Sequence, residues 1–84
     1  MKWLVSYDLD KPGQDYKRID TELKRLGAVR VLDSEWALES SKSAVQLRDY
    51  FNSFIDSTDR LLISPLENWA SWNLMTDINK VWAA

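Results

Sequence analysis

The sequence predicts an α+β fold in which a four-stranded antiparallel sheet carries two helices on one face. Three observations predict it. Residues near the N-terminus alternate between apolar and polar side chains, two later segments repeat apolar residues at helical spacing, and a pair of short apolar runs lies between those segments. With one more apolar run the order is strand, helix, strand, strand, helix, strand, which is the ferredoxin-like arrangement.

The first strand is predicted from Lys2 to Asp8, where every second residue is apolar. A Lys-Pro-Gly-Gln turn at residues 11–14 separates it from the first helix, which we expect from Asp15 to Leu26. Apolar residues in that helix are three, four and three positions apart; they are Tyr16, Ile19, Leu23 and Leu26. Gly27 then provides a C-terminal cap.

The middle of the chain predicts two strands and a second helix. The strands cover Val29–Leu32 and Trp36–Leu38 and are joined at Asp33-Ser34. The helix is expected from Ser43 to Ile55, because Ser43 and Gln46 have the spacing of a capping box. A last strand is expected in "RLLISPL", which begins at residue 60 and is ended by a proline.

These elements divide the chain into a core of residues 1–66 and a C-terminal extension of residues 67–84. Two helices on one face leave the other face of the sheet open, and an exposed apolar sheet face usually marks a partner surface. We therefore expect the extension to pack on the sheet or on the partner in a dimer. Five aromatic residues are the candidates for packing or dimer contacts: Trp3, Tyr7, Trp69, Trp72 and Trp82.

The three tryptophans of the extension have a second interpretation, which is base stacking on single-stranded nucleic acid. Few cations stand beside them in the sequence, and this favours packing. Leu74, Ile78 and Val81 also recur there at helical spacing, and Thr76 can cap a short helix.

Composition excludes several kinds of chemistry. The chain has no histidine and no cysteine, so imidazole or thiolate catalysis and His- or Cys-ligated zinc are excluded. No apolar run is long enough to span a membrane, and the first residues lead directly into a strand rather than a secretory signal. We therefore expect a cytoplasmic protein with no membrane partner.

The formal net charge is −2, which gives no overall basic footprint for nucleic acid. A local basic stripe is expected on one face of the first helix, and its members are Lys17, Arg18, Lys24 and Arg25. These side chains are candidates for phosphate contacts in RNA or DNA. The alternative is a solvated helix face with ion pairs such as Asp20 with Lys24, and the acids Asp20 and Glu22 favour it.

Two carboxylates follow the first strand, and they allow two interpretations. Asp8 and Asp10 are candidate ligands of Mg²⁺, which prefers oxygen atoms and usually takes one or two carboxylates while it keeps several waters. Aspartate is also common in turns, and Asp10 stands just before Lys-Pro-Gly. The residues themselves leave both interpretations open.

Four features together resemble a known family. They are the strand ending in Tyr7-Asp8, the helix with Lys17-Arg18, the strand pair around "DSEWALES" with the second helix after it, and the segment "DRLLISPL". The chain resembles the small ferredoxin-like CRISPR-associated proteins that partner the integrase in spacer acquisition, many of which are metal-dependent endoribonucleases. "SYDLDKPGQDY" and the Trp-rich segment are similar to the SinR-like branch of this family. Virulence-associated protein D is related to the family and shares its fold. The resemblance covers most of residues 1–75.

The resemblance implies a homodimer whose sheets face each other, so that Asp8 approaches its twin near the two-fold axis. Two copies of Asp8 would then hold one Mg²⁺ for phosphodiester hydrolysis, with Asp8 as the catalytic residue and a CRISPR integrase as the protein partner. The family's active-site serine corresponds to Ser34, followed by Trp36, although Asp33-Ser34 also fits a plain turn. The alternative function is a non-catalytic dimeric adaptor or toxin-type module in prokaryotic or phage defence.

Overall fold

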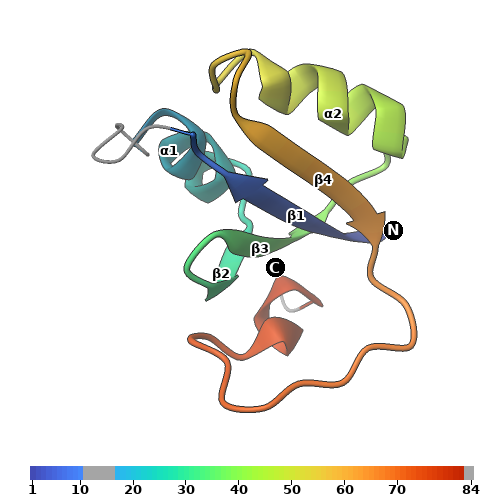
Figure 1. Cartoon of the computed structure of the whole chain (residues 1–84). Coiled ribbons are helices and arrows are strands. Elements are labelled where there is room, and N and C mark those ends of the chain that lie inside the picture. Colours follow the sequence, from blue (N-terminus) through green and yellow to red (C-terminus); the bar gives the residue numbers. More distant parts are fainter. Residues whose placement is uncertain (11–16, 83–84) are drawn as a thin grey trace.

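The computed structural model describes residues 1–10 and 17–82, and within them the α+β fold is confirmed (Figure 1). The elements follow the predicted ferredoxin-like order. They are β1 (Lys2–Asp8), α1 (Lys17–Arg25), β2 (Val29–Leu32), β3 (Glu35–Glu39), α2 (Ala44–Asn52), β4 (Arg60–Pro65) and a short 3-10 helix, η1 (Ile78–Trp82). The predicted turn at residues 11–14 and the first two residues of the predicted helix lie outside the described residues.

The sheet has the strand order β2-β3-β1-β4, and each pair of neighbours is antiparallel. The strand β1 is therefore central, and Val5 pairs with Trp36 of β3 on one side and with Ile63 of β4 on the other. The strand β2 has a register shift between Arg30 and Leu32. The pairing with β3 ends at Ser6, whereas the pairing with β4 continues to Asp8, so the C-terminal end of β1 is held by β4.

Both helices cover the same face of the sheet. Alternation places Trp3, Val5 and Tyr7 on that face, and all three side chains are buried. They pack with the buried apolar residues of the two helices, which are Ile19, Leu23, Leu47 and Phe51. This cluster is the main hydrophobic core of the domain.

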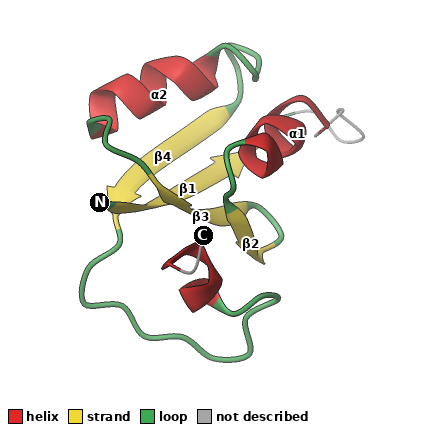
Figure 2. Cartoon of the chain, turned by 180° about the vertical axis from the view of Figure 1, so that it is seen from behind, coloured by secondary structure: helices red, strands yellow, loops and turns green. Residues whose placement is uncertain are grey.

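The opposite face is covered in part by the C-terminal extension. After β4 the chain runs as a long loop past the end of the sheet and returns to η1 beside β2 and β3 (Figure 1 and Figure 2). Ile78 and Val81 of η1 are buried against Val31 and Ala37. The short helix begins at Ile78, two residues after Thr76. Aliphatic side chains of η1 therefore make a buried contact with the sheet.

Local hydrogen bonds explain where α2 begins and ends. The predicted capping box is confirmed: Gln46 N–H donates to Ser43 Oγ at 3.1 Å, and Ser43 N–H donates to Gln46 Oε1 at 2.9 Å. The helix ends at Asn52, earlier than the predicted Ile55. Ser53 N–H and Phe54 N–H instead donate to carbonyls three residues back, which tightens the last turn.

Gly27 ends α1 in the left-handed region, at φ +82°. Gly27 N–H donates to the Lys24 carbonyl and Ala28 N–H donates to the Leu23 carbonyl, each at 3.0 Å, and these two bonds form a Schellman motif. An added Cβ would meet nothing within 4 Å. The cost of a side chain here is therefore a cost of the backbone conformation alone.

Replacing Gly27 with alanine is expected to lower the free energy of unfolding by about 1 kcal/mol, because an L-residue is disfavoured in the left-handed region. Asparagine tolerates that region better, so Gly27→Asn is expected to cost about half as much. Urea denaturation of the three proteins measures both values. An alanine variant as stable as the parent would contradict the role of Gly27 as a cap.

Candidate functional site

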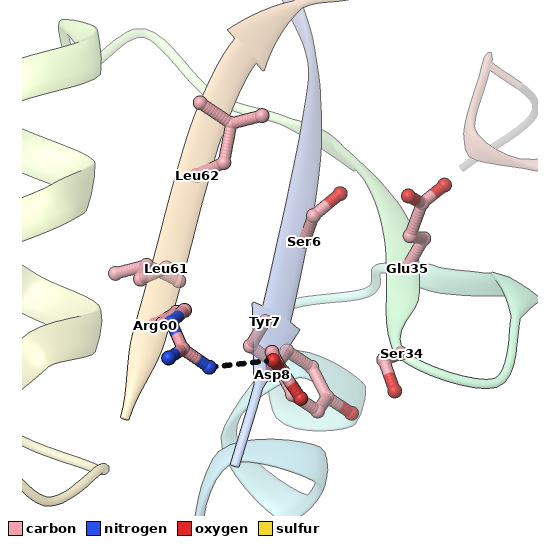
Figure 3. Close-up of a pocket in the computed structure, with 8 residues that line it drawn as sticks. All are labelled: Ser6, Tyr7, Asp8, Ser34, Glu35, Arg60, Leu61 and Leu62. Carbon is pink, nitrogen blue, oxygen red and sulfur yellow. Dashed lines mark hydrogen bonds and ion pairs between the residues drawn. The ribbon is translucent and has the colours of Figure 1, made fainter. Parts of the chain in front are cut away.

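A pocket of about 240 Å³ opens around the C-terminal end of β1. Its lining comes from β1, β4, the turn between β2 and β3, and the start of β3, and its residues are Ser6, Tyr7, Asp8, Ser34, Glu35, Arg60, Leu61 and Leu62. Figure 3 shows Arg60 on one side of the end of β1 and Ser34 on the other. The pocket therefore brings together Asp8 and Ser34, which the resemblance implies as site residues.

Asp8 is exposed in this pocket and forms an ion pair with Arg60. The two residues are opposite each other in the β1–β4 register, and Arg60 Nη1 lies 3.0 Å from Asp8 Oδ2 (Figure 3). Their side chains are 70% and 73% exposed, and an ion pair at such exposure contributes at most about 1 kcal/mol. The Asp8 carboxylate can therefore exchange its arginine partner for another cation at little cost.

Asp10 lies outside the pocket lining. Its backbone N–H donates to Asp59 Oδ1 at 2.8 Å, and Asp59 Oδ2 accepts a hydrogen bond from Asp56 N–H at 2.7 Å. Asp59 thus ties Asp10, two residues beyond the end of β1, to the loop before β4. The structure gives the two predicted metal ligands different surroundings, and only Asp8 faces the pocket.

The donor atoms in the pocket suit a cation that keeps most of its water. No group of three or more Asp, Glu, His or Cys side chains suited to a metal ion occurs among residues 1–10 and 17–82. Asp8 and the hydroxyl groups of Ser6 and Ser34 offer oxygen atoms, which match the preference of Mg²⁺. Asp8 and Glu35 are the carboxylates that line the pocket, so one chain offers at most two of them to a largely hydrated Mg²⁺.

Ser34 and Trp36 have structural roles in the described chain. The Ser34 carbonyl accepts a hydrogen bond from Tyr7 N–H at 3.0 Å, so Ser34 fixes the turn between β2 and β3 against β1. Trp36 is only 2% exposed, and its Nε1–H donates to the Tyr7 hydroxyl at 3.1 Å. Trp36 is therefore a core residue and is not available for stacking on a ligand.

Behind the pocket, a polar network joins β1 to α1 and β2. The Tyr7 hydroxyl donates to Asp20, which also forms an ion pair with Arg30. The Arg30 guanidinium carbon lies 4.8 Å from the centroid of a Trp36 ring. Burial, followed by the hydrogen bond to Asp20, raises the pKa of Tyr7 to about 12. Tyr7 is therefore a neutral donor at physiological pH, and it fixes the strand end that carries Asp8.

The four predicted phosphate-binding residues differ in what they contact. Arg18 Nη2 donates to the Ser53 carbonyl at 2.7 Å, just after α2 ends, where a positive charge is favourable. Arg25 Nη2 lies 2.5 Å from Glu22 Oε2, and this guanidinium lowers the pKa of the Glu22 carboxyl. Lys17 and Lys24 are exposed. Both arginines therefore have partners within the chain.

Asp20 pairs with Arg30 of β2 instead of Lys24 of its own helix.

Of the predicted packing residues, Trp3 and Tyr7 are in the core, whereas Trp72 is 91% exposed. The side chain of Trp82 lies outside the described residues, so the prediction for it stays open.

Sequence reasoning missed Arg60, which is 52 residues from Asp8. A signal for it existed: in the predicted arrangement the last residue of the first strand is opposite the first residue of the last strand. That pairing alone would have placed an arginine next to Asp8.

No family model matches the chain, and no solved structure matches it. In the part of the chain that the structure describes, no helix has the length and apolar character needed to cross a membrane.

Proposed function

We propose that the protein is a homodimeric, Mg²⁺-dependent nuclease of the cytoplasm that cleaves RNA or DNA, with Asp8 as its catalytic carboxylate. The observation that carries the proposal is the exposed position of Asp8 in an open pocket, next to an arginine that it can release at little cost. The resemblance to CRISPR-associated endoribonucleases supports the same residue. A CRISPR integrase is the protein partner that the resemblance implies.

In this proposal Asp8 and Arg60 exchange partners when substrate binds. Asp8 would hold the hydrated ion, and Arg60 would then be free to contact a phosphate oxygen, for which a guanidinium is well suited. When bound, Mg²⁺ supplies an activated water and stabilises the charge that develops on the phosphate. Ser6 and Ser34 line the same pocket and can position water by hydrogen bonds.

The dimer in this proposal uses the part of the open sheet face that η1 leaves uncovered. Leu62 stands there with 61% of its surface exposed, directly opposite Ser6 in the β1–β4 register. A two-fold contact presents the same patch on both copies, so Leu62 and the neighbouring Asp8 would each meet the partner surface. Such a contact would bring a second copy of Asp8 to the site.

Asp8→Asn is expected to lower the rate of Mg²⁺-dependent cleavage at least tenfold, because the amide keeps the shape of the side chain and removes its charge. The assay uses single-stranded RNA and single-stranded DNA, each with Mg²⁺ and with EDTA. Asp49→Asn is the matched control, since Asp49 is an exposed aspartate that pairs with Arg48 on α2. We expect its rate to stay within twofold of the parent.

Cleavage that survives Asp8→Asn or EDTA would contradict the proposal, as would a parent protein that cleaves neither substrate. Light scattering on a sizing column tests the dimer separately. A monomer at micromolar concentration would contradict the paired site.

A second candidate function is a non-catalytic dimeric adaptor or toxin-type module in prokaryotic or phage defence. The observation that favours it is the use of Arg18 and Arg25 in contacts within the chain, which reduces the positive charge offered to a phosphate backbone. In that case Asp8→Asn would leave the biological effect unchanged.

A further inference from the structure

A second hollow lies on the same side of the sheet as η1, between the sheet and the loop that follows β4. Its volume is about 290 Å³. Leu4, Leu32 and Glu35 line it from the strands, and Trp69, Trp72 and Leu74 line it from the loop. We refer to it as the tryptophan groove. Glu35 also lines the Asp8 pocket, so the two hollows are neighbours on one face.

The groove exposes large apolar side chains that the fold does not need for its core. Trp72 is 91% exposed, Leu32 is 43% exposed and Trp69 is 39% exposed. In contrast, Trp3 and Trp36 are buried. Tryptophan is the residue type most enriched among the energetic centres of protein interfaces, and clustered exposed apolar side chains usually mark a binding surface.

The loop wall of the groove is fixed at both ends. Leu66 N–H donates to the Lys2 carbonyl before the loop, and Met75 N–H donates to the Val31 carbonyl after it, each at 2.9 Å. Between these anchors, Asn68 and Asn73 have φ values of 50° and 55°. Asparagine is among the few residues that adopt this left-handed conformation readily, so the sequence suits the two bends that enclose the tryptophans. A preformed groove loses less entropy when it binds a ligand.

Charge identifies the kind of ligand. Glu35 is the one charged residue among the described residues that line the groove. Within residues 1–10 and 17–82, its carboxylate forms no ion pair and no hydrogen bond. Asp33 and Glu67 are exposed next to Leu32 and Leu66, which also line the groove. Phosphate groups would be repelled by these carboxylates, whereas a cation would be attracted to them. Tryptophan faces also attract cations.

We propose that the tryptophan groove binds a short basic peptide segment of a partner protein. A lysine or arginine side chain of that segment lies between the tryptophan rings and Glu35, and an apolar neighbour packs on Leu4 and Leu32. This inference goes beyond the nuclease proposal and does not depend on it.

The probe is a phage-displayed library of random heptapeptides selected on the immobilised full chain. We expect the selected peptides to be enriched in lysine or arginine next to apolar residues. Selection on the Trp72→Ala protein is expected to lose that enrichment. Enrichment of acidic or purely apolar peptides would overturn the proposal, and so would no enrichment at all or equal enrichment on Trp72→Ala.

The selected peptide then allows affinities to be compared between variants. Kd is expected to rise at least tenfold for Trp72→Ala and about fivefold for Glu35→Gln, as expected for the loss of an aromatic centre and of a charge partner. Matched controls are Val45→Ala, which alters a side chain of α2 that is 56% exposed, and Asp49→Asn. Both controls are expected to bind as the parent does, and circular dichroism confirms that each variant is folded.

Two further results would overturn the proposal in favour of another occupant. One is displacement of the peptide by single-stranded oligonucleotide, which would indicate base stacking on the tryptophans. The other is a self-association that Trp72→Ala abolishes, which would indicate a second copy in the groove. Asp8→Asn is expected to bind the peptide normally, so failure of the nuclease proposal is distinguishable from failure of this one.

Discussion

Phe51→Ala is expected to lower the free energy of unfolding by about 4 kcal/mol, which is within the range for loss of a fully buried phenylalanine. Phe51 has 0% of its surface exposed and belongs to the core between α2 and the sheet. It also makes an edge-to-face contact with Tyr50, with ring centroids 5.3 Å apart. A domain of this size typically has a total stability of roughly 5 to 10 kcal/mol, so the variant should be close to unfolding.

Urea denaturation followed by circular dichroism measures this loss. Val45→Ala is the matched control, because Val45 is on the same helix and 56% exposed, and it should change stability by less than about 0.5 kcal/mol. Phe51→Leu, which keeps most of the apolar volume, should lose less than the alanine variant. Equal losses for Phe51→Ala and Val45→Ala would contradict the packing of α2 on this face.

The features that the sequence predicted well are those set by neighbouring residues. Alternation from Lys2 to Asp8 correctly separated the buried Trp3 and Tyr7 from Asp8, because side chains point to opposite faces of a strand in turn. The capping box at Ser43 and the left-handed cap at Gly27 depend on contacts within one turn, and both are confirmed. Local patterns of this kind determined the order of the elements and hence the fold.

The features that the sequence could not predict depend on contacts between distant segments. Helical spacing placed Arg18 and Arg25 on one face of α1, but it did not show that Arg18 reaches the end of α2 or that Arg25 reaches Tyr50. Likewise, Asp20 pairs with a strand residue, Arg30, because α1 packs across the sheet. The periodicity of one helix contains no information about which neighbour lies opposite each side chain.

The C-terminal extension illustrates a second limit. Apolar content predicted that the extension packs on the sheet or on a partner, and within the described residues Ile78 and Val81 pack against Val31 of β2 and Ala37 of β3. Trp72 then remains 91% exposed. Composition shows that a segment can bury apolar surface, but the geometry of the loop decides which side chains do so. Which tryptophans of the extension are exposed is therefore known only from the structure.

Alkaline pH is expected to destabilise the fold through Tyr7. Burial, and then the hydrogen bond to Asp20, raises the pKa of Tyr7 from 10.0 to about 12. Below pH 10 both the folded and the unfolded chain keep the phenolic proton, and the stabilisation is fully present. Between pH 10 and pH 12 the unfolded chain releases the proton while the folded chain retains it. The free energy of unfolding therefore falls by about 1.4 kcal/mol per pH unit, or about 3 kcal/mol in total.

Tyr7→Phe isolates this effect, because phenylalanine has no proton to release and the lysines titrate in both proteins. At pH 8 the variant is expected to be less stable than the parent by about 1 to 2 kcal/mol, since Asp20 and Trp36 Nε1 each lose a hydrogen-bond partner. That difference should shrink above pH 10 and reverse before pH 12. Urea denaturation at four pH values from 8 to 11.5 measures it. A difference in the free energy of unfolding that stays constant over this range would show that Tyr7 has the same pKa in the folded and unfolded chains. Burial and the hydrogen bond to Asp20 would then not raise that pKa.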